Sequence, residues 1–365
     1  MARKGLKDMT ITRKRAGSYR LRRSRFGAVL GMIAAVALVL AGCSVDNSGD
    51  DSKPTIRLAY QSFPSGDLIV KNNGWLEEAL PDYNIKWTKF DSGADINTAF
   101  VAKEVDFAAI GSSPVARGLS APLNIPYQVA FVLDVAGDNE ALVARNGTGI
   151  ETVADLKGKR VATAFASTAH YSLLAALDQA GVNPKDVNLI DLQPQASLAA
   201  WQRGDVDAVY TWLPTLDELR QDGTTLIASR QLATAGKPTL DLGVVSSEFA
   251  TANPEVVNTW RQVQARALTL IKDDPQAAAD AVAAQLGTTP EDAANQLRQG
   301  TFLTVAELTS PTWLGTQGNP GNLSENLHSA AVFLAEQQQI PAAPPIETFR
   351  EAIYTEGLPG VLEQQ

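Results

Sequence analysis

Residues 187–214 have the sequence VNLIDLQPQASLAAWQRGDVDAVYTWLP, and this stretch decides the fold class. The apolar runs at 187–192 and 208–212 predict two strands, and the apolar spacing between them predicts a helix over 196–203. A strand, a helix and a second strand in this order build a parallel sheet that helices cover. The sequence therefore favours an α/β protein.

The same alternation continues on both sides of this stretch. Strands are expected at 56–60, 84–90, 107–110, 128–133 and 160–164, and helices at 67–80, 96–103, 113–119, 152–156 and 170–180. After residue 245 the pattern is almost entirely helical, and helices expected at 254–272, 275–286 and 290–298 each begin at a proline. No third sheet is expected. Two α/β lobes with a helical C-terminal segment favour a ligand cleft at the carboxyl ends of the strands.

The first 42 residues have the pattern of an export signal. Seven Lys and Arg side chains lie between residues 13 and 25, and the apolar run at 26–40 is short for a membrane span but suits a signal-peptide core. The LAGC sequence at 40–43 is similar to a lipobox, whose cysteine is acylated and becomes the new N-terminus. We expect cleavage before Cys43, a flexible tether over 43–54 and an extracytoplasmic protein anchored by lipid to the cell membrane. A buried free cysteine in an N-terminal anchor helix is the alternative.

The charge balance argues against nucleic acid as a partner. The first 42 residues hold ten of the 31 Lys and Arg side chains and one of the 40 Asp and Glu, so the other 323 residues carry 21 against 39, a net charge of −18. A surface this acidic repels nucleic acid. Cys43 is the only cysteine, and His170 and His328 are the only histidines, so we expect neither disulfides nor a metal site.

The motifs of common enzyme classes are absent from the sequence. It has no G-x-S-x-G, no phosphate-loop lysine motif and no H-E-x-x-H. The GTG sequence at 147–149 lacks the third glycine of a dinucleotide-binding loop and is interpreted as a turn. A Ser–His–Asp triad that uses His170 stays open as an alternative. We expect a protein that is not an enzyme and that needs no cofactor.

Two stretches place hydroxyl side chains where a strand ends and a helix begins. In GSSP (111–114), Ser112 or Ser113 suits the N-cap and the proline suits the first turn. Ser167, Thr168 and His170 in ASTAH (166–170) are expected at the equivalent place of the second lobe. Free N–H groups and the helix dipole attract anions, so the two helix starts predict a site for one small anion between the lobes. Ordinary capped helices, with His170 packed on its own helix, are the alternative.

Three further residues suit a cation. Trp212 ends the strand expected at 208–212, where an aromatic face can cover an ammonium group. Asp241 lies in the apolar stretch PTLDLGVV (238–245), and Glu140 lies in DNEALV (138–143). A carboxylate at such a place either caps a turn or pairs with a cation, and Trp212 either contacts ligand or packs between lobe surfaces.

Six blocks of the sequence resemble the taurine-binding proteins of ABC importers, which belong to the sulfonate/nitrate group of periplasmic binding proteins. They are WTKFDSGADI (87–96), IGSSPVA (110–116), GDNEALV (137–143), FASTAHYSLLAAL (165–177), LQPQASLAAWQRGDVDAVYTWLP (192–214) and PTLDLGVV (238–245). The resemblance runs from about residue 56 to residue 308. It implies a two-lobed type II periplasmic-binding-protein fold that captures a small sulfonate and delivers it to a membrane permease with its ATPase. Another aliphatic sulfonate or nitrate stays open as the ligand, and an enzyme on the same fold or an adhesion module are the rival functions.

The resemblance also implies the site and the lobe boundaries. The sulfonate would meet Ser112, Ser113, Ser167, Thr168 and His170, with Gln61 as a further contact, and the amine of taurine would meet Asp241, Glu140 and Trp212. Lobe 1 would comprise 55–142 plus 244–365 and lobe 2 would comprise 143–243, in a chain expected to act as a monomer. Gly243 and Phe302 replace larger or more polar residues of relatives, which predicts a larger or less polar pocket.

Overall fold

The computed structural model describes residues 53–358, which form two lobes, each built on a five-stranded sheet. The predicted signal peptide, the lipobox cysteine Cys43 and nearly all of the predicted tether lie outside the described residues. Within 53–358, no helix combines the length and the apolar character that a membrane crossing requires.

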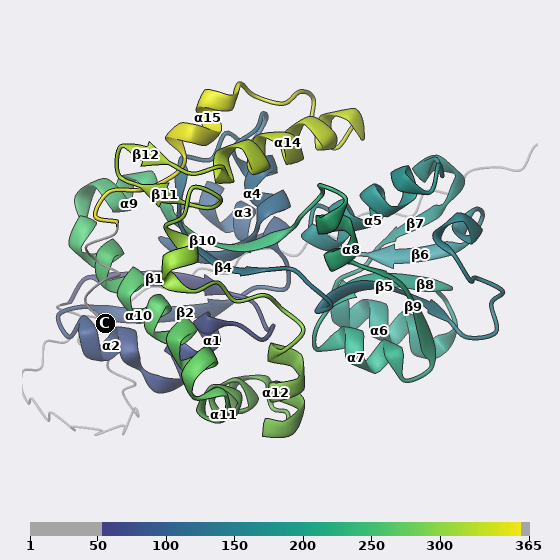
Figure 1. The fold of residues 1–365 in the computed structure, drawn as a ribbon, viewed down its shortest axis with the longest axis horizontal. Helices are drawn as coiled ribbons and strands as arrows, with labels where there is room; N and C mark the ends of the chain where they lie inside the picture. The colour runs from purple at the N-terminus through teal and green to yellow at the C-terminus, as the bar shows by residue number, and fades with distance from the viewer. Residues whose placement is uncertain (1–52, 359–365) are drawn as a thin grey trace, which may run out of the picture. The chain divides into compact units, whose positions relative to one another are not determined.

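The first sheet has the strand order β2-β1-β3-β10-β4 (Figure 1). Strands β1 (Thr55–Tyr60), β2 (Asn84–Lys89) and β3 (Phe107–Gly111) are parallel, while β10 (Leu240–Ser246) runs antiparallel to both β3 and β4 (Tyr127–Val135). Helices α1 (Gly66–Asn73), α2 (Trp75–Ala79), α10 (Pro254–Asp273) and α11 (Pro275–Leu286) cover one face. Helices α3 (Gly93–Val101), α4 (Ser112–Gly118) and α14 (Leu323–Glu336) cover the other.

The second sheet repeats this plan, with the order β7-β6-β8-β5-β9. Strands β6 (Arg160–Thr163), β7 (Asn188–Asp191) and β8 (Ala208–Trp212) are parallel, and β5 (Glu140–Arg145) runs antiparallel to β8 and β9 (Gly223–Ala228). Helices α5 (Thr168–Gln179) and α8 (Ser229–Thr234) pack on one face, and α6 (Pro194–Arg203) and α7 (Thr215–Arg220) on the other (Figure 1). The predicted fold class, α/β with two lobes and a helical C-terminal segment, is confirmed.

The structure differs from the sequence pattern in several elements. The helix expected at 67–80 is broken at Gly74, whose φ of 64° ends α1 in a left-handed turn. Strands β5, β9 and β10 and helices α7, α8 and α14 have no counterpart among the predicted elements. A two-stranded hairpin, β11 (Gly315–Thr316) with β12 (Asn319–Pro320), lies in the region where no third sheet was expected. The remaining elements are η1 (Val153–Leu156), η2 (Pro184–Asp186), α9 (Ser247–Ala252), α12 (Pro290–Leu297), α13 (Val305–Leu308) and α15 (Ile346–Glu351).

The chain crosses between the lobes through two short linkers. The expected boundaries, 142/143 and 243/244, fall inside β5 and β10, each of which belongs wholly to one sheet. We therefore propose to place the boundaries at 136–139 and 235–239. The two linkers contact each other, because the Ala136 N–H donates to the Thr239 carbonyl at 3.0 Å. The first linker also contacts the C-terminal segment, where the Asp138 N–H donates to the Gln299 carbonyl at 2.9 Å.

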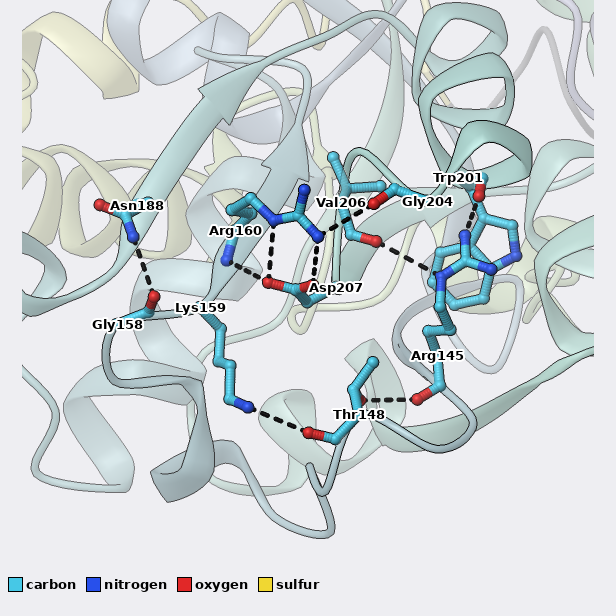
Figure 2. A network of polar contacts seen from close by, with 10 residues as sticks. All are labelled: Arg145, Thr148, Gly158, Lys159, Arg160, Asn188, Trp201, Gly204, Val206 and Asp207. Atoms are coloured by element: carbon cyan, nitrogen blue, oxygen red, sulfur yellow. Dashed lines mark hydrogen bonds and ion pairs between the residues drawn. The ribbon is translucent and has the colours of Figure 1, made fainter.

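Each sheet has an Arg–Asp clamp at the amino ends of its parallel strands, which shows again that the two lobes share one plan. In lobe 1, Arg57 at the start of β1 donates from its N–H and its guanidinium to Asp106, the residue before β3. In lobe 2, Arg160 at the start of β6 donates in the same way to Asp207, the residue before β8 (Figure 2). Each arginine also reaches the carbonyl three residues before its aspartate. The clamps thus tie β1 to β3 in lobe 1 and β6 to β8 in lobe 2.

Candidate functional site

A cavity lies between the lobes at the carboxyl ends of the parallel strands, the place that the fold class predicts. Its volume is about 30 Å³, room for about two ordered waters. Fourteen residues from both lobes line it: Gln61, Phe63, Pro64, Gly93, Gly111, Pro114, Ala136, Asn139, Glu140, Ser167, Thr168, Trp212, Leu213 and Asp241. A neighbouring cavity of about 80 Å³ shares Gln61, Trp212 and Leu213 and continues the cleft toward Gln193 and Lys89.

Six of the nine ligand-contact residues predicted from the sequence therefore meet at one place: Gln61, Glu140, Ser167, Thr168, Trp212 and Asp241. Ser112, Ser113 and His170 do not line the cavity. Ser112 and Ser113 are buried, and the Ser112 hydroxyl accepts a hydrogen bond from the Leu240 N–H at 3.0 Å. The N-cap of α4 is Gly111, where Ser112 or Ser113 was expected.

The sequence suggested that the starts of α4 and α5 occupy equivalent places in the two lobes. The structure shows that they do not. Helix α4 follows β3, the last of the parallel strands β1, β2 and β3, whereas α5 follows β6, the first of the parallel strands β6, β7 and β8. They nevertheless meet: a Cβ at Gly111 would lie only 2.5 Å from the Thr168 Cγ2 atom. Glycine at 111 thus permits close contact between the lobes at the edge of the cavity.

The hydroxyls at the start of α5 are already engaged within lobe 2. The Ser167 hydroxyl donates to the Ala164 carbonyl at 2.6 Å and accepts from the His170 N–H, so it acts as the N-cap. The Thr168 hydroxyl donates to Glu140 at 2.5 Å. What this helix start offers an anion is the first-turn backbone N–H groups of Thr168 and Ala169, which a helix leaves without partners, together with the helix dipole.

His170 supports this turn from behind. Its Nδ1 accepts a hydrogen bond from the Ala166 N–H at 3.2 Å, and its ring stacks on Phe165 with ring centroids 4.6 Å apart. Burial lowers the pKa of His170 to about 4, so the ring is neutral at physiological pH. Its environment suits a structural role rather than that of a general base, because an acceptor nitrogen is occupied by backbone.

Glu140 is surrounded by hydroxyl groups. Its carboxylate accepts hydrogen bonds from Thr168, Ser172, Ser229 and Thr239 at 2.5, 3.1, 2.6 and 3.2 Å. Burial raises its pKa, and the four hydroxyls lower it in part. Glu140 joins α5, α8 and one of the linkers, so it orders the lobe 2 wall of the cavity.

Two further carboxyl groups lie on the lobe 1 side. Asp241 on β10 lines the cavity, and Asp134 on β4 is its direct partner in the antiparallel register. Burial raises the pKa of Asp241 well above its ordinary value, and the negative charges of Asp134 and Glu140 raise it further. Within 53–358, no Lys, Arg or His forms an ion pair with any of these three acids. Asp134 is not among the residues predicted from the sequence, although a lone acid in the apolar run QVAFVLDV (128–135) is the same signal that marked Asp241.

Two hydrogen bonds hold the polar side chains of the cleft, and the first joins residues that the sequence pattern did not single out. Ser92 and Gln193 are the N-caps of the equivalent helices α3 and α6, and the Gln193 side chain donates to the Ser92 hydroxyl across the cleft at 3.3 Å. Gln61 is held by a bond from its side-chain N–H to the Ala109 carbonyl at 3.2 Å. Together these bonds fix the polar walls of the cleft on both sides.

The expectation of a larger pocket at Gly243 is wrong. A Cβ at Gly243 would lie 2.1 Å from the Trp260 ring, so this glycine faces α10 inside lobe 1 and not the cavity. The Trp260 indole occupies the space that a side chain at 243 would need. Phe302 lines a separate hollow beside the C-terminal end of α10. Among residues 53–358 no group of three or more His, Cys, Asp or Glu side chains is arranged to hold a metal ion.

Two five-stranded lobes, one reversed strand in each sheet and a cavity between the carboxyl edges define the class of two-lobed periplasmic binding proteins. The crystal structure of the periplasmic aliphatic sulphonate binding protein SsuA from Escherichia coli has this fold, with a TM-score of 0.66 at 23% identity, covering 83% of this chain and 98% of that one. The chain belongs to the NMT1/THI5-like family, whose model matches residues 84–278.

Two relatives place the chain within the sulfonate/nitrate group of solute-binding proteins. The taurine-binding periplasmic protein of Escherichia coli K12 is 38% identical over 79% of this chain and 88% of its own length. A putative aliphatic sulfonates-binding protein of Bacillus subtilis 168 is 33% identical over 68% of this chain and 75% of its own length. The predicted family is confirmed.

Proposed function

We propose that this protein is an extracytoplasmic solute-binding protein that captures taurine and delivers it to an ABC permease and its ATPase. The observation that carries the choice of ligand is the cluster of buried carboxyl groups beside the start of α5, where no cationic side chain of the described residues pairs with it. The name of the Escherichia coli relative supports the same ligand.

Taurine is a short zwitterion, with a sulfonate at one end and an ammonium at the other. The first-turn N–H groups of α5 suit the sulfonate, because they present positive dipole ends to an anion. Asp241, which retains exposure to the cavity, suits the ammonium, and Trp212 offers it an aromatic face. Both charges of the ligand thus have partners on opposite lobes, which favours closure of the lobes around it.

Another aliphatic sulfonate is the rival ligand, and the name of the Bacillus subtilis relative favours it. A sulfonate without an amine leaves the buried carboxyl cluster without a counter-charge, which costs binding free energy. Nitrate also has no cationic group, so it would leave the carboxyl cluster without a counter-charge as well. A catalytic function finds no support at His170, because that ring is packed on Phe165 and accepts a backbone N–H.

Calorimetric titration with taurine, ethanesulfonate, longer alkanesulfonates and nitrate tests the proposal. A charge-assisted hydrogen bond in a closed cleft contributes about 1.5–3 kcal/mol, roughly tenfold to a hundredfold in affinity. Asp241→Asn should weaken taurine by that factor and leave ethanesulfonate nearly unchanged. Asp280→Asn, which removes the same charge from the exposed surface of α11, is the matched control and should change neither. Equal losses for both ligands in Asp241→Asn would show that Asp241 is structural.

We further propose that Cys43 is acylated and tethers the protein to the outer side of the membrane. The support is the LAGC sequence behind a basic and apolar leader. Mass spectrometry of the N-terminal peptide of the native protein should find a lipid-modified Cys43. A membrane-bound chain that still starts at Met1 would contradict this tether.

A further inference from the structure

We propose that Asp134 and Asp241 form a carboxyl pair that keeps one proton in the ligand-free protein and releases it when the ammonium group of the ligand binds. The inference rests on the proposed function and deepens it. In this proposal Asp241 contacts the ligand. Asp134, on the neighbouring strand β4, is a positioning residue that acts through Asp241.

The geometry brings the two acids together at the wall of the cavity. They are direct partners across the antiparallel pair β10–β4, at a point where the register is irregular. Asp134 is 1% exposed, and its carboxyl oxygens find no hydrogen-bond partner among the described residues apart from Asp241, whose backbone and carboxyl group interact with them. Asp241 faces the cavity. Asp134 is buried and Asp241 is half-buried at the cavity wall, and two carboxyl groups this close cannot both stay ionised without a counter-charge, so one of them holds a proton.

The groups around the pair supply no such counter-charge. Glu140 from β5 adds a third negative charge, and the segment that packs against Asp134 offers Gly300, with Asn139 and Phe302 nearby. The arginines of the linker region have other partners: Arg230 pairs with Asp138 at 3.0 Å, and Arg220 donates to the Asp138 carbonyl and to Gln299. His170, on α5, is neutral at physiological pH. The ammonium of the ligand is therefore the cation that this pair can accept.

The exchange balances in charge and in atoms. In the ligand-free protein the pair is one carboxylic acid and one carboxylate. When the ammonium arrives at Asp241, its positive charge compensates the second negative charge, the carboxyl O–H bond breaks and the proton passes to the buffer. Ethanesulfonate brings no cation, so its binding leaves that proton in place.

The pKa values agree with this exchange and fix its direction. Burial raises the pKa of Asp134 to about 7, and that of Asp241 is raised by burial and by its acidic neighbours. Because binding of the amine favours the ionised pair, taurine affinity should rise with pH until the pair is ionised in the free protein. Below that pH the affinity should fall by about tenfold per pH unit when one proton is exchanged.

Calorimetry of the mature protein in buffers of different ionisation enthalpy counts the protons directly. At pH 6 we expect taurine binding to release about one proton, and ethanesulfonate binding to release none. Asp134→Asn should abolish the release and flatten the pH dependence of taurine affinity. Asp67→Asn is the matched control: Asp67 is buried, with a pKa raised to about 7, but it bonds to Gln264 and does not line the cavity, so the release should persist.

The outcomes separate the two proposals. Taurine that binds without proton release between pH 5.5 and 7 overturns the proton exchange and leaves the proposed function standing. Ethanesulfonate that binds while no amine-bearing sulfonate does overturns both. If Asp134→Asn does not fold, the comparison of taurine with ethanesulfonate in the wild-type protein still decides, because equal proton release for the two ligands contradicts the exchange.

Discussion

The two lobes repeat the same scaffold but supply opposite chemistry to the cleft. At the amino edges, Arg57–Asp106 and Arg160–Asp207 are near copies. At the carboxyl edges, lobe 1 presents the Asp134–Asp241 pair and lobe 2 presents a helix start lined by hydroxyls. The edge that holds a sheet together is duplicated, whereas the edge that meets a ligand has diverged, so that each lobe suits one end of a zwitterion.

The largest difference in stability between the two lobes should appear when the Arg–Asp clamps are removed. The side chain of Asp106 is 8% exposed and that of Asp207 is 18% exposed. Breaking a buried pair strands a charge, and we discount the usual cost because both arginines reach solvent. We expect Asp106→Ala to lower the free energy of unfolding by about 2–3 kcal/mol and Asp207→Ala by about 1–2 kcal/mol, measured by urea titration. Asp205→Ala, at an exposed pair with Arg203, should cost under about 0.5 kcal/mol. A larger loss at Asp207 than at Asp106 would contradict the ranking by burial.

Acid should act in opposite directions on the stability that His170 provides in lobe 2 and on the stability that the buried acids of lobe 1 provide. In lobe 2 the pKa of His170 is lowered to about 4 in the folded state, so the unfolded chain binds more protons between about pH 6.5 and 4. Stability from this group is complete above pH 6.5 and is lost as the pH falls, by about 2 kcal/mol at pH 5. In lobe 1 the raised pKa values of Asp67 and Asp134 act the other way, because these buried acids cost less when protonated.

Thermal unfolding of His170→Asn between pH 7 and 5 tests this prediction. The amide oxygen of asparagine occupies the place of Nδ1 and can accept the hydrogen bond from the Ala166 N–H. We expect the variant to lose less stability on acidification than the wild-type protein. An unchanged pH dependence would mean that His170 does not govern acid loss in lobe 2.

The contact where the lobes meet should produce a smaller change, which is seen in binding. Gly111→Ala places a Cβ 2.5 Å from the Thr168 Cγ2 atom. Overpacking of this kind costs about 1–3 kcal/mol, so taurine affinity measured by calorimetry should fall roughly tenfold. Thr168→Ser removes that methyl group and keeps the hydroxyl that donates to Glu140, so the double variant should recover most of the affinity. Failure of this rescue would show that the lobes close without the Gly111–Thr168 contact.

Much of the fold could be predicted from the sequence, because apolar runs and proline starts report local structure. The strands that form the centre of each sheet have such runs, whereas β9 has the sequence GTTLIA and becomes a strand by pairing with β5. The exact crossing points depend on which sheet takes β5 and β10, and that is a tertiary property.

The site was predictable in its residue types but not in its contacts. Six predicted residues line one cavity because the ends of the strands bring them together. The burial of Ser112 and Ser113, the bond from the Leu240 N–H to Ser112, and the engagement of the Ser167 and Thr168 hydroxyls depend on packing that a sequence does not reveal. Asp134 could have been found, since a lone acid in a buried strand is a visible signal.

The small volume of the cavity has a kinetic consequence. At about 30 Å³ it cannot admit a molecule with a sulfonate, two methylene groups and an ammonium while the lobes keep this separation. Association and dissociation must therefore wait for the lobes to part. The residence time of a ligand then depends on how often bonds such as Gln193–Ser92 break, as well as on the chemistry of the pocket. Two ligands of very different affinity can leave at rates closer than their affinities suggest, because the same opening step limits both.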